Sequence, residues 1–192
     1  NALNFLTNGF GSFPLSGTLA GRGAFASMDS VYQLLPTYAF VADGQKTVRV
    51  HEASVPGVDP ARAKSAWDFH EELTRARSRN RGLDGYERVI VRCVTGIRQP
   101  TGQSAVLDAA RLTIVNAERD GEDRSGDGTV PRISTTAVGE NDNASTFVAN
   151  THAALAGDDG VIAHLKAIIE GSTIDLSQYR LPGPTGALSL LF

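Results

Sequence analysis

The segment that most constrains this chain is residues 125–131, which read Ser-Gly-Asp-Gly-Thr-Val-Pro. A glycine stands on each side of Asp127, and glycines let a backbone turn where a side chain would clash. Pro131 follows Val130, and a residue before proline is driven away from the helical conformation. The segment therefore predicts a short polar loop that holds one carboxylate in a fixed place beside structured chain.

A histidine, His152, follows further along the chain, just before an amphipathic helical pattern. An acid on a loop after a strand, then a histidine on a loop before a last helix, is the spacing of the acid and the base in an α/β-hydrolase. The triad of that fold runs in chain order serine, aspartate, histidine. Asp127 fits the acid and His152 fits the base, so these two are the candidate catalytic residues.

Two motifs resemble the lecithin:cholesterol acyltransferase family, which belongs to the α/β-hydrolase superfamily. One is Gly-Asp-Gly-Thr-Val-Pro at residues 126–131, and the other is Ser-Val-Tyr-Gln-Leu-Leu-Pro at residues 30–36, about half the chain away. The resemblance covers most of residues 1–170 by the order of elements. It implies cleavage or transfer of an ester-linked fatty acyl group, a lipid or acyl-ester substrate, and no cofactor.

Acyl transfer also needs a serine nucleophile, which an α/β-hydrolase carries in a Gly-x-Ser-x-Gly turn between a strand and a helix. The chain has no such motif, and residues 17–21 have the two glycines without a serine between them. We therefore expect the serine to lie upstream of Asn1. The missing nucleophile half would be an upstream segment of a longer protein or a separate partner chain.

The expected fold class is α/β, namely the C-terminal part of an α/β-hydrolase core sheet with a cap excursion, the nucleophile half being absent. The cap or excursion region takes residues 1–85, and the core region takes residues 86–192. Helical patterns cover residues 1–10, 30–35 and 60–79, and a further pattern predicts a last helix that ends at Gly171. Strand patterns cover residues 38–50, 86–95, 105–107, 112–115 and 146–149. Residues 11–26 are rich in glycine and serine and favour a flexible loop.

Local signals refine this outline. Asp43-Gly44 is a preferred two-residue hairpin turn, and Asp59-Pro60 supplies a helix N-cap and a first-turn proline. The apolar run at residues 89–94 is typical of a strand buried on both faces. If the chain is only half of a domain, one face of this strand should be exposed or should be covered by another chain. The last helix is expected to bury a stripe made of Val161, Ile162, Leu165, Ile168 and Ile169.

Composition narrows the class of protein. The 192 residues are 41% hydrophobic, which suffices for one domain with a sizeable core. The net charge of −3 argues against nucleic-acid binding, which needs clustered basic surface. No stretch is apolar for long enough to cross a membrane. The single cysteine, Cys93, excludes an intrachain disulfide, is expected in the core, and favours the cytoplasm.

Other interpretations of the same residues stay open. Residues 123–128 resemble the start of a calcium loop, but the twelfth position is Ser134 where a glutamate is wanted. No histidine and cysteine pattern has zinc spacing. The chain would otherwise be a non-catalytic binding or interaction module, or an inactive relative of the hydrolases.

The sequence also predicts the roles of two further histidines and of the single tryptophan. His70 and His164 lie on or beside apolar helix faces, where a histidine is more often structural than catalytic. Trp67 lies on the helix over residues 60–79. It would either contribute an apolar wall near the acyl pocket or only pack the cap against itself.

Overall fold

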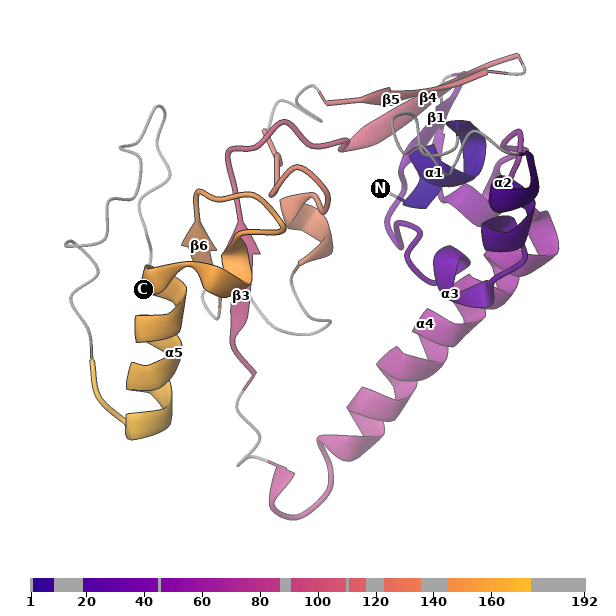
Figure 1. Ribbon diagram of the computed structural model, residues 1–192. Helices are drawn as coiled ribbons and strands as arrows, with labels where there is room; N and C mark the ends of the chain where they lie inside the picture. The colour runs from indigo at the N-terminus through magenta and orange to yellow at the C-terminus, as the bar shows by residue number, and fades with distance from the viewer. Residues whose placement is uncertain are drawn as a thin grey trace. The chain divides into compact units, whose positions relative to one another are not determined.

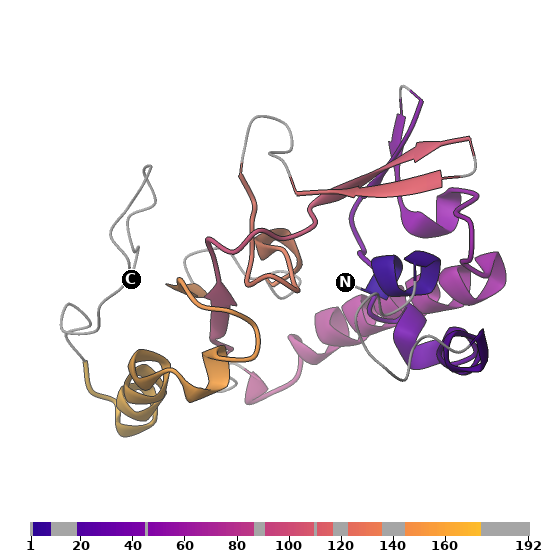
Figure 2. The same cartoon turned by 45° about the horizontal axis from the view of Figure 1, so that its top comes forward.

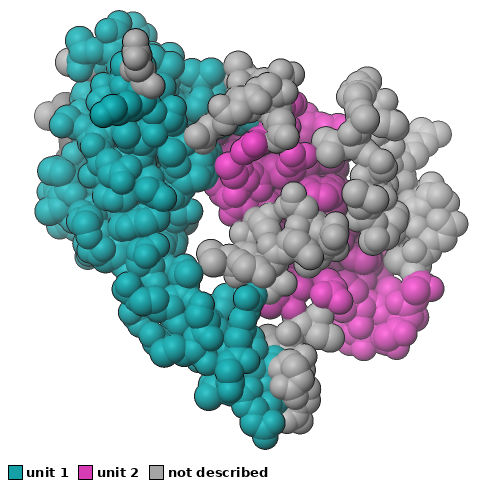
Figure 3. Space-filling model, turned by 180° about the vertical axis from the view of Figure 1, so that it is seen from behind, with its two compact units in different colours: residues 1–90, 103–115 teal, residues 91–102, 116–192 magenta. Residues whose placement is uncertain are grey.

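The computed structural model describes residues 2–8, 19–44, 46–86, 91–109, 111–116, 123–135 and 145–173. In these residues it is mixed α/β, with a mixed four-stranded sheet and five α-helices (Figure 1), which confirms the expected α/β class. Contacts between residues divide the chain into two compact units (Figure 3). Unit 1 comprises Asn1–Ile90 and Gln103–Val115, and unit 2 comprises Val91–Gly102 and Asn116–Phe192.

Unit 1 contains a sheet with strand order β2-β1-β4-β5. Its strands are β1 (Val41–Asp43), β2 (Lys46–Val48), β4 (Ser104–Asp108) and β5 (Arg111–Val115). Strands β1 and β2 are antiparallel, which confirms the predicted hairpin. Asp43 pairs with Lys46, however, so the turn begins at Gly44, which has a φ of +60°, and not at Asp43 as predicted. Strand β4 pairs in parallel with β1, with Val41 opposite Ala105, and antiparallel with β5 (Figure 2).

The parallel pairing of β1 with β4 determines which residues belong to each unit. The sequence suggested a boundary between residues 85 and 86, and the chain passes from unit 1 to unit 2 after Ile90. Gln103–Val115 then returns to unit 1, because β4 and β5 extend its sheet. Such a return depends on pairing between distant segments, which no local pattern reveals.

Unit 1 also contains four α-helices and a 3-10 helix whose bounds lie within the described residues. They are α1 (Ala2–Asn8), α2 (Leu19–Ala26), α3 (Asp29–Tyr32), the 3-10 helix η1 (Val50–Glu52) and α4 (Pro60–Asn80). Helix α4 begins as expected, because the Asp59 side chain accepts hydrogen bonds from the N–H groups of Ala61 and Arg62. No helix in the described part of the chain combines the length and the apolar character that crossing a membrane requires.

Helix α2 corrects one expectation. The sequence favoured a flexible loop over residues 11–26, but Leu19–Ala26 is helical, and residues 9–18 lie outside the described residues. Leucine, alanine and arginine are good helix formers, and they offset the two glycines in this segment. Phe25 of α2 also meets Phe5 of α1 edge to face, with ring centroids 5.3 Å apart, so tertiary packing supports the helix.

The hydrophobic core of unit 1 forms one cluster between its helices and its sheet. Its buried members are Leu3, Leu6, Tyr32, Leu35, Phe40, Val41, Val50, Val55, Ala63, Ala66, Ala105 and Leu112. Phe40, Val41 and Ala105 are fully buried at the β1–β4 pairing. The core therefore uses side chains from both stretches of unit 1.

Unit 2 contains two parallel strands, β3 (Cys93–Gly96) and β6 (Ser145–Val148), with Cys93 opposite Ser145. The helices of its described residues are the 3-10 helices η3 (Arg132–Ser134) and η5 (Leu155–Gly157) and the α-helix α5 (Asp159–Glu170). Gly171 ends α5 with a φ of +64°, as expected. The strand expected over residues 86–95 begins only at Cys93, and residues 87–90 lie outside the described residues.

Few apolar side chains of unit 2 are buried among its described residues. They are Ile97, Pro131, Val148, Val161 and Ala167. The buried stripe expected on α5 is wrong at Ile162, Leu165 and Ile169, which are 51%, 42% and 85% exposed. Cys93 is also only half-buried, so it is not the core residue expected. The physical reason is that the described residues of this unit provide two strands, which is too little sheet to cover a 12-residue helix.

Candidate active site

Asp127 lies in a tight loop between the two strands of unit 2. Its Oδ1 accepts hydrogen bonds from the N–H groups of Thr129 at 2.9 Å and Val130 at 2.7 Å. A Cβ on Gly126 would lie 1.7 Å from the Val130 carbonyl oxygen, and Gly128 has a φ of +91°, so this turn requires both flanking glycines. Asp127 is only 4% exposed, so the loop holds one carboxylate in a fixed place, as predicted.

The structure brings His152 into contact with Asp127. The ring nitrogen Nδ1 of His152 lies 2.7 Å from Oδ2 of Asp127, and the backbone N–H of His152 donates to the Asp127 carbonyl oxygen at 2.9 Å. An acid that orients a catalytic base must lie within hydrogen-bonding distance of it, about 2.6–3.2 Å, and these two side chains meet that requirement. The His152 side chain is 56% exposed, so one partner is buried and the other reaches solvent. The catalytic roles of the two residues stay a prediction.

A short turn between β6 and α5 carries His152. The N–H groups of Ala154 and Leu155 donate to the Thr151 carbonyl oxygen, which fixes the turn. The Asn150 side chain accepts a hydrogen bond from the Thr151 N–H at 2.8 Å and donates to the Asp158 carboxylate at 3.0 Å. Asp158 is also the N-cap of α5, so the histidine turn is tied to the start of the last helix.

The protonation state of the pair follows from the surroundings of Asp127. Burial by itself would raise the pKa of the Asp127 carboxyl. The hydrogen bonds from the Val130 N–H, the His152 ring and the Thr129 N–H outweigh it, so the pKa lies below its ordinary value. The carboxylate is therefore ionised at neutral pH and can only accept hydrogen bonds. The Nδ1 of His152 must then carry the proton, which leaves Nε2 of a neutral ring as a proton acceptor.

This lowered pKa predicts a loss of stability in acid. The pKa of an aspartate in an unfolded chain is about 4. Ionised Asp127 therefore stabilises the fold above that pH. The contribution is lost as the pH falls through the lower pKa of the folded state. Urea unfolding from pH 6 to pH 2 should show the wild-type advantage over Asp127→Asn shrinking on acidification. An advantage that stays constant with pH would contradict the assignment.

The carboxyl end of β3 passes directly against Asp127. A Cβ on Gly96, the last residue of β3, would lie 2.4 Å from the Asp127 Cβ and 3.1 Å from Leu155 Cδ1. His152 follows the carboxyl end of β6, so both members of the pair lie at the carboxyl ends of parallel strands, where α/β folds bind ligands. The sequence did not single out Gly96, because this contact joins segments that are far apart in the chain.

Gly96→Ala should therefore destabilise unit 2. We expect a loss of roughly 1–3 kcal/mol, because the added methyl group must displace the backbone that carries Asp127. Urea unfolding at neutral pH measures the effect. Gly157→Ala is the matched control, since a Cβ there meets no atom within 4 Å, and its effect should stay within about 0.5 kcal/mol. Equal midpoints for the two variants would show that Gly96 is not tightly packed.

His70 and His164, for which the sequence predicted structural roles, each have a hydrogen-bond partner. The His70 Nε2 lies 2.8 Å from the Gln33 carbonyl oxygen, to which it donates. The His164 Nε2 lies 2.9 Å from the Thr146 hydroxyl oxygen. Both contacts join a helix to a neighbouring segment of the same unit, which agrees with the structural roles expected of these residues.

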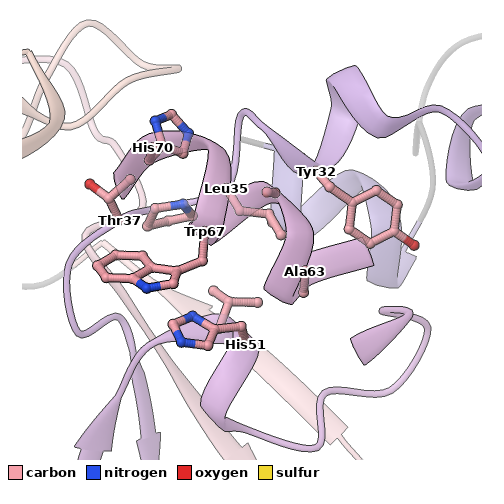
Figure 4. A pocket seen from close by; sticks show the side chains of 10 residues that line it. Tyr32, Leu35, Thr37, His51, Ala63, Trp67 and His70 are labelled. Carbon is pink, nitrogen blue, oxygen red and sulfur yellow. The ribbon is translucent and has the colours of Figure 1, made fainter. Parts of the chain in front are cut away.

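A pocket in unit 1 is lined by Trp67, His51 and His70 (Figure 4). Part of its space is open solvent, and the enclosed space is far smaller than that of most ligand pockets. The His51 ring stacks on Trp67 with centroids 5.0 Å apart, and the Arg49 guanidinium lies 4.6 Å from the Trp67 ring centroid. These contacts favour the packing role of Trp67, and its role as an acyl wall stays a prediction.

The geometry argues against the calcium interpretation of residues 123–128. Oδ1 of Asp123 accepts hydrogen bonds from the N–H and the hydroxyl of Ser125, at 2.8 Å and 2.6 Å. Both oxygens of Asp127 also accept hydrogen bonds. In the part of the chain that the structure describes, no group of three or more histidine, cysteine, aspartate or glutamate residues is arranged to hold a metal ion.

Comparisons of the chain with protein-family models, with curated proteins and with solved structures found no match. The interpretation of the site therefore depends on its own chemistry. That chemistry is a buried carboxylate, ionised at neutral pH, which orients an exposed imidazole.

Proposed function

We propose that Asp127 and His152 are the acid and the base of a serine-dependent acyl hydrolase or acyltransferase. The observation that carries the proposal is the 2.7 Å hydrogen bond from His152 Nδ1 to a carboxylate that is 4% exposed, on a ring that reaches solvent. This arrangement orients an imidazole and leaves Nε2 as a general base. An ordinary ion pair on the surface would not need a buried carboxylate. It would also not need the two backbone N–H groups that donate to Oδ1 of Asp127.

The proposed reaction assigns one step to each group. His152 Nε2 takes the proton of a serine hydroxyl as that oxygen attacks the ester carbonyl carbon. Asp127 stabilises the imidazolium that forms and does not itself become protonated. His152 then gives the proton to the leaving alcohol, and an acyl-serine remains. Water or an acceptor alcohol, activated by the same imidazole, releases the acyl group.

The proposed fold is the C-terminal part of an α/β-hydrolase similar to the lecithin:cholesterol acyltransferase family. Its support is the position of the Asp127 and His152 loops at the carboxyl ends of parallel strands β3 and β6. The exposed apolar side chains of α5 add support, since further parts of a sheet would cover them. The lipid or acyl-ester substrate comes from the motif resemblance alone.

The proposed serine lies outside these residues, upstream of Asn1 or on a partner chain. The alternative is a non-catalytic binding module or an inactive relative. In such a module the hydrogen bond between Asp127 and His152 would only hold the two loops of unit 2 together. The coding sequence upstream of Asn1 discriminates the two, because the enzyme requires a Gly-x-Ser-x-Gly segment between a strand and a helix.

The biochemical test uses the full-length protein. Nitrophenyl esters of increasing acyl length measure turnover, and a fluorophosphonate probe labels an activated serine. We expect turnover together with labelling of one serine that is absent from residues 1–192. A protein that is folded, shows neither labelling nor turnover, and has no upstream Gly-x-Ser-x-Gly segment would support the binding module instead.

A further inference from the structure

Thr101 is a buried residue whose hydroxyl contacts the Asp127 loop on both sides of the aspartate. The residue is 1% exposed, and its Oγ1 accepts hydrogen bonds from the N–H groups of Gly126 at 3.0 Å and Gly128 at 2.9 Å. The same hydroxyl donates to the Gln99 carbonyl oxygen at 2.7 Å. All of these residues belong to unit 2.

The hydrogen-bonding capacity of this hydroxyl is completely used. A threonine hydroxyl offers one donor and two acceptor positions. The two amides can only donate, so the hydroxyl proton must point to the Gln99 carbonyl oxygen, and each bond has a defined direction. One oxygen atom thus restrains the Asp127–Gly128 peptide group, which is joined directly to the aspartate, and the Ser125–Gly126 peptide group, one residue further along on the other side.

The segment that leads to Thr101 contacts the same loop at two further points. Gly96 lies against the Asp127 Cβ, and the Gln99 N–H donates to the Gly126 carbonyl oxygen at 3.0 Å. Between them, Arg98 has a φ of +67°, a left-handed conformation that few non-glycine residues adopt. Strained backbone of this kind persists where the surrounding structure over-determines it, often near functional sites.

We infer that Thr101 is a positioning residue for the Asp127–His152 pair. A loop with glycines at positions 126 and 128 has many accessible conformations, so it needs an external restraint to hold the carboxylate within hydrogen-bonding distance of the imidazole. Thr101 supplies that restraint through its hydrogen bonds to the loop. The inference concerns the geometry of the pair, and only its effect on catalysis depends on the proposed function.

The test compares Thr101→Val with Thr101→Ser. Valine keeps the shape and removes the hydroxyl, whereas serine keeps the hydroxyl and removes the methyl group. The readout is the proton NMR signal of the His152 Nδ1–H, which is shifted strongly downfield when it donates to a buried carboxylate. We expect the signal to disappear in Thr101→Val and to persist in Thr101→Ser. Persistence in a folded Thr101→Val protein would overturn the inference.

Hydrogen exchange on the wild-type chain gives a second test that no folding defect can obscure. The amides of Gly126 and Gly128 donate to the Thr101 hydroxyl, so they should exchange at least about tenfold more slowly than in an unfolded peptide. Exchange of both amides at the unfolded rate would show that the hydroxyl does not restrain the loop.

In the full-length enzyme, Thr101→Val should lower kcat about a hundredfold with little change in KM, because a small displacement of the base slows the chemical step. Thr101→Ser should restore most of the loss. If the wild-type protein has no esterase activity, the proposed function fails, while the NMR comparison still decides the role of Thr101.

Discussion

His152→Ala in the full-length protein is expected to lower ester turnover by about a million-fold, since removing the base of a serine triad costs roughly that much. The serine then keeps its proton as it attacks, and no other group takes over. Folding should survive, because the His152 side chain is 56% exposed and fills no core position. Turnover of a nitrophenyl ester measures the loss, with a thermal melt run beside it.

The other histidines provide the controls for that variant. His70 and His164 have their own hydrogen-bond partners, the Gln33 carbonyl and the Thr146 hydroxyl. Changing either to glutamine should keep turnover within about tenfold, and any loss should follow the melting temperature. If His152→Ala stays active while His70→Gln does not, the base has been assigned to the wrong histidine.

Asp127→Asn is expected to lower turnover by roughly ten-thousand-fold, less than the loss of the base itself. The asparagine oxygen can still accept the bonds from Thr129 and Val130, which turns the amide nitrogen toward His152. Because that nitrogen donates, His152 Nδ1 must accept, and the ring proton moves to Nε2. The imidazole then faces the serine in the wrong tautomer and cannot take its proton.

A matched control for this variant lies four residues away. Asp123→Asn makes the same chemical change at an exposed carboxylate whose Oδ1 accepts hydrogen bonds from Ser125. It should leave turnover within about tenfold. A similar loss in both variants would point to a general effect of removing charge from this loop. That result would contradict the proposal that Asp127 orients the His152 ring.

Features set by a few neighbouring residues were predicted well. The Asp59 cap, the turn at Gly44 and the helix end at Gly171 each depend on local backbone geometry, which a short sequence pattern encodes. The contact between Asp127 and His152 was predicted as well, because an ordered spacing of acid, strand and histidine limits where those side chains can lie.

Features that depend on distant segments were missed. Thr101 and Gly96 carry no distinctive local pattern, and their contacts with the Asp127 loop arise only when β3 lies beside that loop. The return of Gln103–Val115 to unit 1 follows from the β1–β4 pairing, which is equally distant. Apolar periodicity on α5 predicted burial, yet burial also needs a covering surface, and the described strands of unit 2 do not supply enough of one.

The parallel pairing of β3 with β6 has a consequence for the order of folding. The loop that closes when Cys93 meets Ser145 contains Asp127, so the pairing must wait until that entire stretch has been synthesised. Closing a long loop costs entropy before its contacts form, which makes parallel, non-local pairs slow to form. A nascent chain should therefore complete the sheet of unit 1 once Val115 emerges. The acid and the base should meet among the last events, when β6 and the turn after it leave the ribosome.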